Sequence, residues 1–247
     1  MAITVHSVPI LEDNYVWIIQ ASGSSSALVL DPGDAEPVIN YLRANDLQPV
    51  ALLITHRDWD HITGILPFLD QYPVPVYGPT NDEIPGLTTA LVAQTGFKPD
   101  DRFPPIQVLD VPGHTPGHIA YLLEDKLFCA DALFTAGCGR VRNNAFRQAY
   151  DSLQRLAALP AETTIHCSHE YTIANLQFAL AVEPHKLAAQ QRLAAVEKQR
   201  ANNELTAKAQ LPLELATNPF LRCDQPNVIA AAEQYASRRL GDDGLAV

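Results

Sequence analysis

Short apolar runs separated by Pro, Gly, Asp and Asn fill the first two thirds of the chain. Runs of about four to eight apolar or alternating residues bounded by turn residues are typical of β-strands. This pattern predicts strands at residues 3–8, 15–19, 27–30, 50–54, 74–77, 106–111, 119–123, 126–129 and 164–167.

Two segments of this region show helical spacing instead. One begins after Asp34 and carries Pro37 in its first turn, where a missing N–H is tolerated. The other spans residues 145–159. The residues that share the inward face of a helix are Val38, Tyr41 and Leu42 in the first and Tyr150, Leu153, Leu156 and Ala157 in the second.

Beyond about Tyr171 the composition shifts to Ala, Leu, Gln, Lys, Arg and Glu, which favour helices. We expect helices over residues 173–181, 184–202 and 227–240, with residues 183–184 and 211–219 as separators. The chain is therefore expected to divide into a strand-rich domain, residues 1–170, and a small helical domain, residues 171–247.

Composition excludes several classes of protein. A content of 47% hydrophobic residues is typical of a globular chain, and no run reaches the length of a membrane span. The net charge of −11 argues against nucleic acid or an anionic membrane as the main partner. The first residues lack the pattern of a signal peptide, and the four cysteines form no CxxC pair, so we expect reduced thiols and a cytoplasmic protein.

A cluster of histidine and aspartate follows the apolar run at residues 50–54. The segment reads Thr55-His56-Arg57-Asp58-Trp59-Asp60-His61. Loops at the carboxyl ends of strands commonly bind ligands. In an extended segment alternate residues point the same way, so we expect His56, Asp58 and Asp60 to converge and His61 to reach the other side.

Three further strands also end close to a histidine or an aspartate, namely His114, Asp131 and His169. A single such residue is usually a turn or cap residue. Four strand ends that each deliver an imidazole or a carboxylate predict a metal site instead, because these groups suit zinc, iron and manganese. His118 is expected to support its neighbours by hydrogen bonding, and His166 to lie in a strand.

These residues resemble the metallo-β-lactamase superfamily, whose hallmark is H-x-H-x-D-H followed by separate His, Asp and His ligands. Within it the chain resembles the hydroxyacylglutathione hydrolases, or glyoxalase II, over nearly its whole length. The segments that carry this resemblance are Asp13-Asn14-Tyr15, Asp31-Pro32-Gly33-Asp34, residues 55–61, residues 112–118, Ala136-Gly137-Cys138-Gly139-Arg140, His169-Glu170-Tyr171 and residues 218–222.

The resemblance implies an α/β (α+β) fold, an αββα sandwich with a small C-terminal helical domain, and two divalent metal ions, Zn, Fe or Mn. By position, the first metal takes His56, Asp58 and His114. The second takes Asp60, His61 and His169. Asp131 bridges the two ions and Asp31 supports the site from beneath, while the family's glutathione contacts fall on Arg140 and Tyr171.

The resemblance also implies the reaction, hydrolysis of S-(2-hydroxyacyl)glutathione thioesters such as S-D-lactoylglutathione. Two cations would lower the pKa of a shared water, and the hydroxide so formed would attack the thioester carbonyl. Among the ligands, Asp60 and Asp131 would be the catalytic carboxylates. The partner is a small-molecule glutathione thioester, and the protein is expected to be a monomer.

The chain departs from the family pattern at three places. Asp58 replaces a histidine, which makes the first metal site harder and more negative or leaves that metal weak or absent, and Arg57 is a candidate partner for Asp58. Residues 142–145 replace an aromatic residue and Glu-Gly-Thr. The helical domain is expected to be short at its C-terminus, because relatives continue beyond the position of residues 241–247 with a basic, aromatic tail, and loss of charge-assisted contacts would weaken glutathione binding.

These departures leave two alternatives open. One is a hydrolase of the same fold with an altered substrate: a lactone, a β-lactam, a phosphodiester or another thioester. The altered segment at residues 142–145 favours it. The other is a catalytically impaired paralogue that binds metal without turnover, and Asp58 is its best support.

Overall fold

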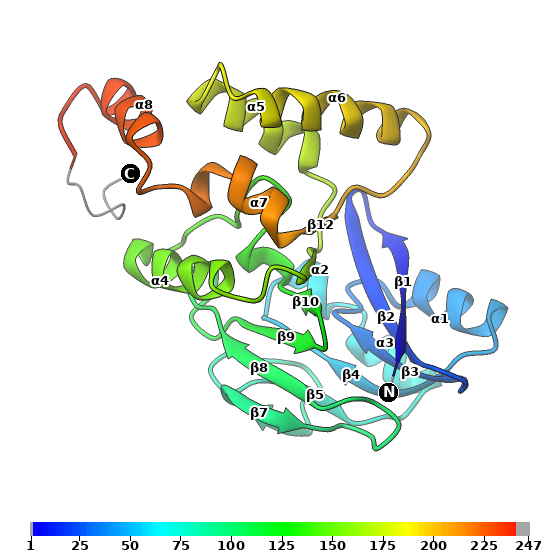
Figure 1. The fold of residues 1–247 in the computed structure, drawn as a ribbon. Coiled ribbons are helices and arrows are strands. Elements are labelled where there is room, and N and C mark those ends of the chain that lie inside the picture. The colour runs from blue at the N-terminus through cyan, green and yellow to red at the C-terminus, as the bar shows by residue number, and fades with distance from the viewer. Residues whose placement is uncertain (1, 241–247) are drawn as a thin grey trace.

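The apolar runs of the first two thirds form two six-stranded sheets in the computed structural model, which describes residues 2–240 (Figure 1). The strands of the first sheet follow the order of the chain: β1 (Ile3–Ile10), β2 (Asn14–Ala21), β3 (Ser26–Leu30), β4 (Gln48–Leu53), β5 (Val76–Pro79) and β6 (Thr89–Leu91). The strands of the second sheet, in spatial order, are β12 (Lys208–Gln210), β11 (Thr164–His166), β10 (Lys126–Phe128), β9 (Ile119–Leu123), β8 (Ile106–Asp110) and β7 (Gln94–Phe97).

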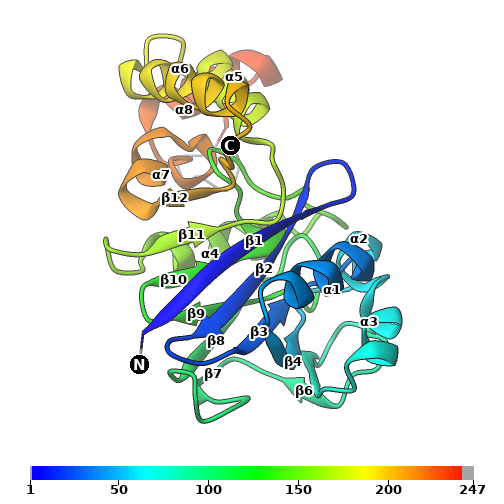
Figure 2. The same cartoon turned by 90° about the vertical axis from the view of Figure 1, so that its right-hand side faces the viewer.

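Helices cover both outer faces of this sandwich. Helices α1 (Ala35–Ala44) and α3 (Ile65–Gln71) lie against the first sheet, and α4 (Phe146–Ala157) lies against the second (Figure 2). The short helix α2 (Trp59–Ile62) follows β4. This arrangement confirms the αββα sandwich.

Alternation along the central strands explains why their sequences are apolar throughout. In β2, Ile18 faces the core beneath α1, whereas Ile19 faces the core between the sheets. In β8, Val108 faces the core between the sheets, whereas Leu109 packs in the core beneath α4. A strand buried on both faces shows no polar alternation, so sequence periodicity reveals that it is buried but not which layer each residue joins.

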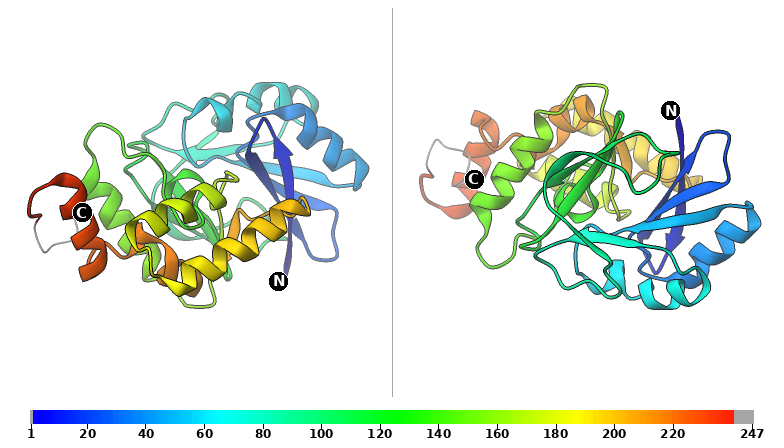
Figure 3. Two further views of the ribbon diagram at one scale, coloured as in Figure 1. Left: turned by 90° about the horizontal axis from the view of Figure 1, so that it is seen from above. Right: turned by 90° about the horizontal axis from the view of Figure 1, so that it is seen from below.

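Helices α5 (Thr172–Val182), α6 (Leu187–Ala201), α7 (Leu211–Thr217) and α8 (Pro226–Ala236) gather at one end of the molecule (Figures 1 and 3). The expected separator at residues 211–219 is wrong, because residues 211–217 form α7, with Pro212 in its first turn. Helix α8 ends at Ala236 rather than at residue 240, because the next residue, Ser237, adopts a left-handed conformation.

Each of the nine expected strands is present, but β6, β7 and β12 were not predicted. Strand β12 comes from the C-terminal part of the chain and pairs with β11 of the second sheet. The division at residue 170 stays a prediction, and β12 ties the helical segment to the sandwich. The expectation about residues 241–247 lies outside the described residues. Among residues 2–240, none of the helices combines the length and the apolar character that crossing a membrane requires.

Candidate metal centre

The polar residues that follow five strands meet at one place in the structure. Asp31 follows β3, Thr55 to His61 follow β4, His114 comes after β8, Asp131 after β10 and His169 after β11. Most of these side chains are buried, including His56, His61, His114, Asp131 and His169. The structure therefore brings together the predicted ligands from four separate strand ends.

The segment after β4 changes conformation at Asp58. Asp58 has extended dihedral angles (φ −64°, ψ 144°) and is followed directly by helix α2. The expectation that Asp60 converges with His56 and Asp58 is therefore wrong, because the helical turn carries Asp60 and His61 to a different group. Helix α2 has only four residues, too few for the sequence pattern to predict it.

Among the described residues, three groups of side chains present ligand atoms within 4.8 Å of one another; one of them, Asp31 with His56 and His61, lies beneath the centre, and the other two form it. Of the two groups that form the centre, the first is His56, Asp58, His114 and Asp131, and the second is Asp60, His61 and His169. Asp131 lies between the two groups. Its carboxylate oxygens are 3.5 Å from Nε2 of His114, 3.3 Å from Nε2 of His61 and 3.4 Å from Nε2 of His169.

The four candidate ligand histidines are all oriented through Nδ1. The partners of these Nδ1 atoms are the Thr55 hydroxyl for His56 (2.9 Å), Asp31 for His61 (3.1 Å), the Arg140 carbonyl for His114 (2.9 Å) and Asp13 for His169 (2.8 Å). With Nδ1 committed, Nε2 is directed to the centre. Metal-binding histidines are commonly fixed in this way.

Sequence reasoning missed several of these supporting residues. It assigned no role to Asp13 or Asn14, although both lie in a segment that carries the family resemblance. The Asn14 amide donates to Asp60 at 2.8 Å, and the hydroxyl of Ser168 donates to Asp131. The sequence signal for Asp13 and Asn14 is a polar pair just before a predicted strand, and such a pair is equally typical of a turn.

Orphaned nitrogens indicate that the centre fits a cation. Among the described residues, Nε2 of His56 and Nε2 of His61 are buried and have no hydrogen-bond partner. An unsatisfied buried polar atom is costly unless it binds something. Imidazole nitrogens beside carboxylate oxygens form a donor set that suits zinc, iron and manganese.

The pKa values of the second group, Asp60, His61 and His169, also indicate that the centre fits a cation. Burial disfavours protonation of His169, but Asp131 and Asp60 outweigh this effect and raise its pKa to about 10. The pKa of His61 is also raised, because Asp131 and Asp31 outweigh burial. Burial opposes ionisation of Asp60, but His169 and His61 lower its pKa to about 2. Protons therefore reside where a cation would bind, and cation binding must release them.

Asp58 has a different partner from the one expected. The expected pairing with Arg57 is wrong, because Arg57 lies beside Asp82, with Nε 3.9 Å from its carboxylate. Asp58 instead forms two hydrogen bonds with Arg142, at 2.7 Å and 2.6 Å. Burial opposes ionisation of Asp58, but His114, His56 and Arg142 hold its pKa well below the usual range.

His118 was expected to support its neighbours by hydrogen bonding; its side chain bonds a backbone neighbour, and among the described residues it forms no hydrogen bond with a candidate metal ligand. Its Nδ1 contacts the Ile119 carbonyl, and its ring stacks on His56 with centroids 4.4 Å apart and planes 11° apart. Burial lowers the pKa of His118 well below its usual value, and His56 and His114 lower it further. His118 is therefore a neutral packing partner of a candidate ligand. His166 lies in β11, as predicted.

The two predicted glutathione contacts lie beside the second group. The ring of Tyr171 stacks on His169, with centroids 4.7 Å apart and planes 8° apart. Burial and the nearby carboxylate of Asp13 raise the pKa of Tyr171 to about 12, so its hydroxyl remains a donor. The side chain of Arg140 is exposed, and its carbonyl holds His114.

Residues of the helical segment hold the loop that leads to Arg140. The buried carboxylate of Glu214 accepts a hydrogen bond from the Ala136 N–H at 2.7 Å and pairs with the buried guanidinium of Arg192. The Asn218 amide donates to the Gly137 carbonyl at 2.9 Å. Substitution of Gly139 is excluded sterically, because a Cβ atom there would lie 1.8 Å from the Asp131 carbonyl oxygen.

The fold and the site define a class of protein. The family model of the metallo-beta-lactamase superfamily matches residues 11–169. The structure of ETHE1 from Myxococcus xanthus aligns with a TM-score of 0.66 over 89% of this chain and 84% of its own, at 24% identity. The BLEG-1 B3 metallo-beta-lactamase aligns with a TM-score of 0.68 over 88% of this chain and 99% of its own, at 21% identity. At such identities the likeness shows the fold alone.

The particular family follows from the whole chain. A model described as the hydroxyacylglutathione hydrolase C-terminus matches residues 170–241. The hydroxyacylglutathione hydrolase of Nitrosomonas europaea is 44% identical over 240 residues, 97% of this chain and 91% of the relative. That of Alkalilimnicola ehrlichii is 45% identical over 241 residues, 98% of this chain and 94% of the relative. This chain belongs to the hydroxyacylglutathione hydrolase family of the metallo-beta-lactamase superfamily.

Proposed function

We propose that this protein hydrolyses S-(2-hydroxyacyl)glutathione thioesters, with S-D-lactoylglutathione as the main substrate, at a centre of two divalent metal ions. The observation that carries the proposal is the position of Asp131 between two groups of ligand atoms, within 3.5 Å of histidines in both. The names of relatives that match nearly the whole chain supply the substrate class.

The first ion would be held by His56, Asp58 and His114, and the second by Asp60, His61 and His169, with Asp131 shared. Two such cations supply activated water and polarise a carbonyl oxygen. The protein's part is orientation, since the Nδ1 atoms of the four histidines are held by Thr55, Asp31, Asp13 and the Arg140 carbonyl. The metal is zinc, iron or manganese, which all suit imidazole and carboxylate ligands.

Asp60 and Asp131 would be the catalytic carboxylates because both lie beside Nε2 of His169, at 3.3 Å and 3.4 Å, within the centre. Asn14 and Ser168 hold their oxygens in place. Arg140 and Tyr171 would bind the glutathione moiety. The exposed guanidinium of Arg140 suits a carboxylate, and the protonated hydroxyl of Tyr171 can donate a hydrogen bond. We further propose that the protein acts as a cytoplasmic monomer.

A second candidate is the same hydrolytic chemistry on a different acyl group or thioester. The observation that favours it is Arg142, a half-exposed cation that lines the same pocket as His114, at a position where the family resemblance implies an aromatic residue. A charged wall would select a different acyl group from an aromatic one.

The test is hydrolysis by metal-free protein reloaded separately with zinc, iron(II) and manganese(II). Substrates would be S-D-lactoylglutathione, S-acetylglutathione and an N-acetylcysteine thioester, with release of free thiol as the signal and metal content measured on the same samples. We expect about two ions per chain and turnover of the first substrate with at least one metal. Turnover of only the N-acetylcysteine thioester would favour the second candidate. Two bound ions without turnover of any substrate would contradict the proposed function.

A further inference from the structure

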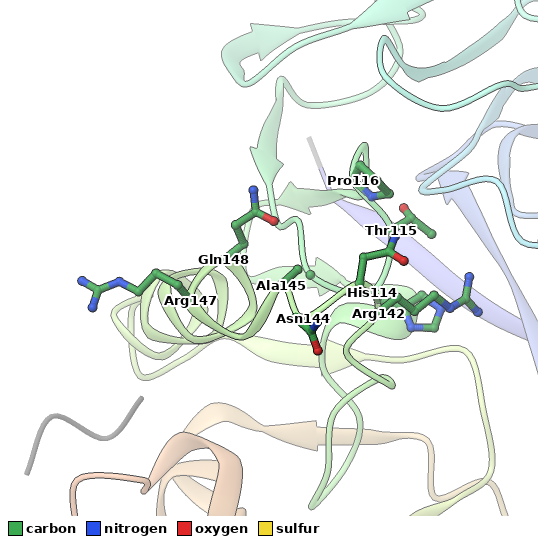
Figure 4. Close-up of a pocket in the computed structure, with 10 residues that line it drawn as sticks. His114, Thr115, Pro116, Arg142, Asn144, Ala145, Arg147 and Gln148 are labelled. Carbon is green, nitrogen blue, oxygen red and sulfur yellow. The ribbon is translucent and has the colours of Figure 1, made fainter. Parts of the chain in front are cut away.

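Asp58 and Arg142 come from segments 84 residues apart and meet at the mouth of the first ligand group. Nη1 of Arg142 donates to Oδ1 of Asp58 at 2.7 Å, and Nη2 donates to Oδ2 at 2.6 Å. In Figure 4 the side chain of Arg142 runs beside that of His114, while Arg147 points the opposite way. Two parallel hydrogen bonds of this kind are the strongest form of a carboxylate–guanidinium contact.

The same carboxylate also faces the predicted ligands. Oδ2 of Asp58 lies 2.9 Å from Nε2 of His114 and 3.7 Å from Nε2 of His56. Its side chain is only 13% exposed, whereas that of Arg142 is 41% exposed. Asp58 therefore links the interior of the centre to a cation at its mouth.

A carboxylate in place of a neutral imidazole adds one negative charge to a group that already contains Asp131. A guanidinium held against it removes that excess. The two departures from the family pattern, at positions 58 and 142, are then physically one change. Besides Asp58, the carboxylates that act on the guanidinium of Arg142 are Asp131 and Asp60 of α2.

We propose that Arg142 is a tuning residue of the metal centre, which cancels the charge of Asp58 so that the pair takes the place of one neutral histidine ligand. This inference rests on the proposed two-metal function. In this inference Asp58 is a working metal ligand and not an inactivating substitution. The effect of either residue on metal binding then depends on the other.

The experiment is a double-substitution cycle measured by zinc affinity, with a chelator competing for the weaker-bound ion. Arg142→Met removes the cation and keeps the aliphatic stem. In the Asp58 protein we expect zinc to bind at least about fivefold more tightly, because a positive charge close to the ion is lost while His114 still holds Oδ2. In the Asp58→His protein the same substitution is expected to change affinity by less than about twofold, because a half-exposed arginine without a partner turns to solvent.

Matched variants separate charge from other causes. Arg147→Met removes a cation of the same segment whose partner is Asp151, and it is expected to leave zinc affinity unchanged. Arg142→Lys keeps the charge but not the paired geometry, so an intermediate affinity is expected. Asp58→Asn is expected to weaken binding of the first ion by at least about tenfold, because a carboxylate ligand is lost.

Thermal unfolding of the metal-free proteins tests the pair independently of the reaction. Arg142→Met should lower the melting temperature of the Asp58 protein and leave that of the Asp58→His protein nearly unchanged. Equal effects of Arg142→Met in both backgrounds, on affinity or on melting, would overturn the inference, as would unchanged zinc binding by Asp58→Asn. If zinc affinity depends on both residues as expected but no thioester is hydrolysed, the proposed function is overturned and the inference about Asp58 and Arg142 is supported.

Discussion

The carboxylate of Asp31 accepts two hydrogen bonds from Thr55, one from its backbone N–H at 2.8 Å and one from its hydroxyl at 2.6 Å. Because Asp31 follows β3 and Thr55 follows β4, this contact joins the ends of two parallel neighbours. The same carboxylate lies 3.1 Å from Nδ1 of His61, and the Thr55 hydroxyl lies 2.9 Å from Nδ1 of His56. One buried side chain therefore fixes a candidate ligand of each metal.

We expect Asp31→Ala to weaken metal binding about 10- to 100-fold, the usual cost of losing a group that orients metal ligands. Competition with a chelator measures this affinity. Asp34→Ala, three residues away in the same loop region, serves as the control because the side chain of Asp34 caps helix α1. It should cost about 1 kcal/mol of stability and leave metal affinity unchanged. Equal metal affinity in both variants would show that Asp31 does not orient His61.

Gly139→Ala should reduce the metal content of the protein and its thioesterase rate at least about tenfold, because a displaced backbone misplaces a ligand. The added Cβ would meet the carbonyl oxygen of Asp131 at 1.8 Å and Nδ1 of His114 at 3.0 Å. Gly96→Ala is the control, since Gly96 has a positive φ but nothing within 4 Å of its Cβ position. Elemental analysis of both variants decides the matter, and full occupancy of Gly139→Ala would contradict the prediction.

Glu214→Ala should destabilise the protein by about 3–5 kcal/mol, because it leaves the buried guanidinium of Arg192 without its counter-charge. It also removes the acceptor of the Ala136 N–H, so we expect a higher KM for the glutathione thioester. Denaturant unfolding measures the first effect. Asp151→Ala breaks the exposed pair with Arg147 and should change stability by less than about 0.5 kcal/mol. A similar loss in both variants would refute the argument from burial.

Because His166 is buried, we expect the free energy of unfolding to fall in mild acid. Burial lowers its pKa to about 4 in the folded protein, whereas an unfolded histidine has a pKa of about 6.5. Between these values the unfolded chain binds a proton that the folded chain refuses, so stability falls as pH falls from about 6.5 to 4, by about 3 kcal/mol in all. His166→Phe should flatten this dependence. Unfolding of metal-free wild type and variant from pH 7 to 4.5 checks it, and parallel curves would contradict the assignment.

Local chemistry made much of the sandwich predictable. The central strands are apolar because both of their faces are covered, and turn residues bound them. Strands β7 and β12 escaped notice because they are short and polar, and their pairing with β8 and β11 supplies what their sequences do not. Residues 211–219 were expected to separate two helices, but residues 211–217 form α7, whose Pro212 lies in the first turn, where proline fits a helix.

The sequence by itself determined which residue types follow which strands, and so indicated a metal centre at His56, Asp60, His61, His114, Asp131 and His169. Alternation along the segment could not determine how those residues divide, because one turn of helix at α2 redirects Asp60 and His61; only the family resemblance implied the division. Nor could the sequence find the partner of Asp58, since Arg142 lies 84 residues away, in the segment after β10, and approaches only when β4 and β10 are packed in opposite sheets. Side-chain type is a local property of the chain, but the distance between two charges depends on the packing of the whole sandwich.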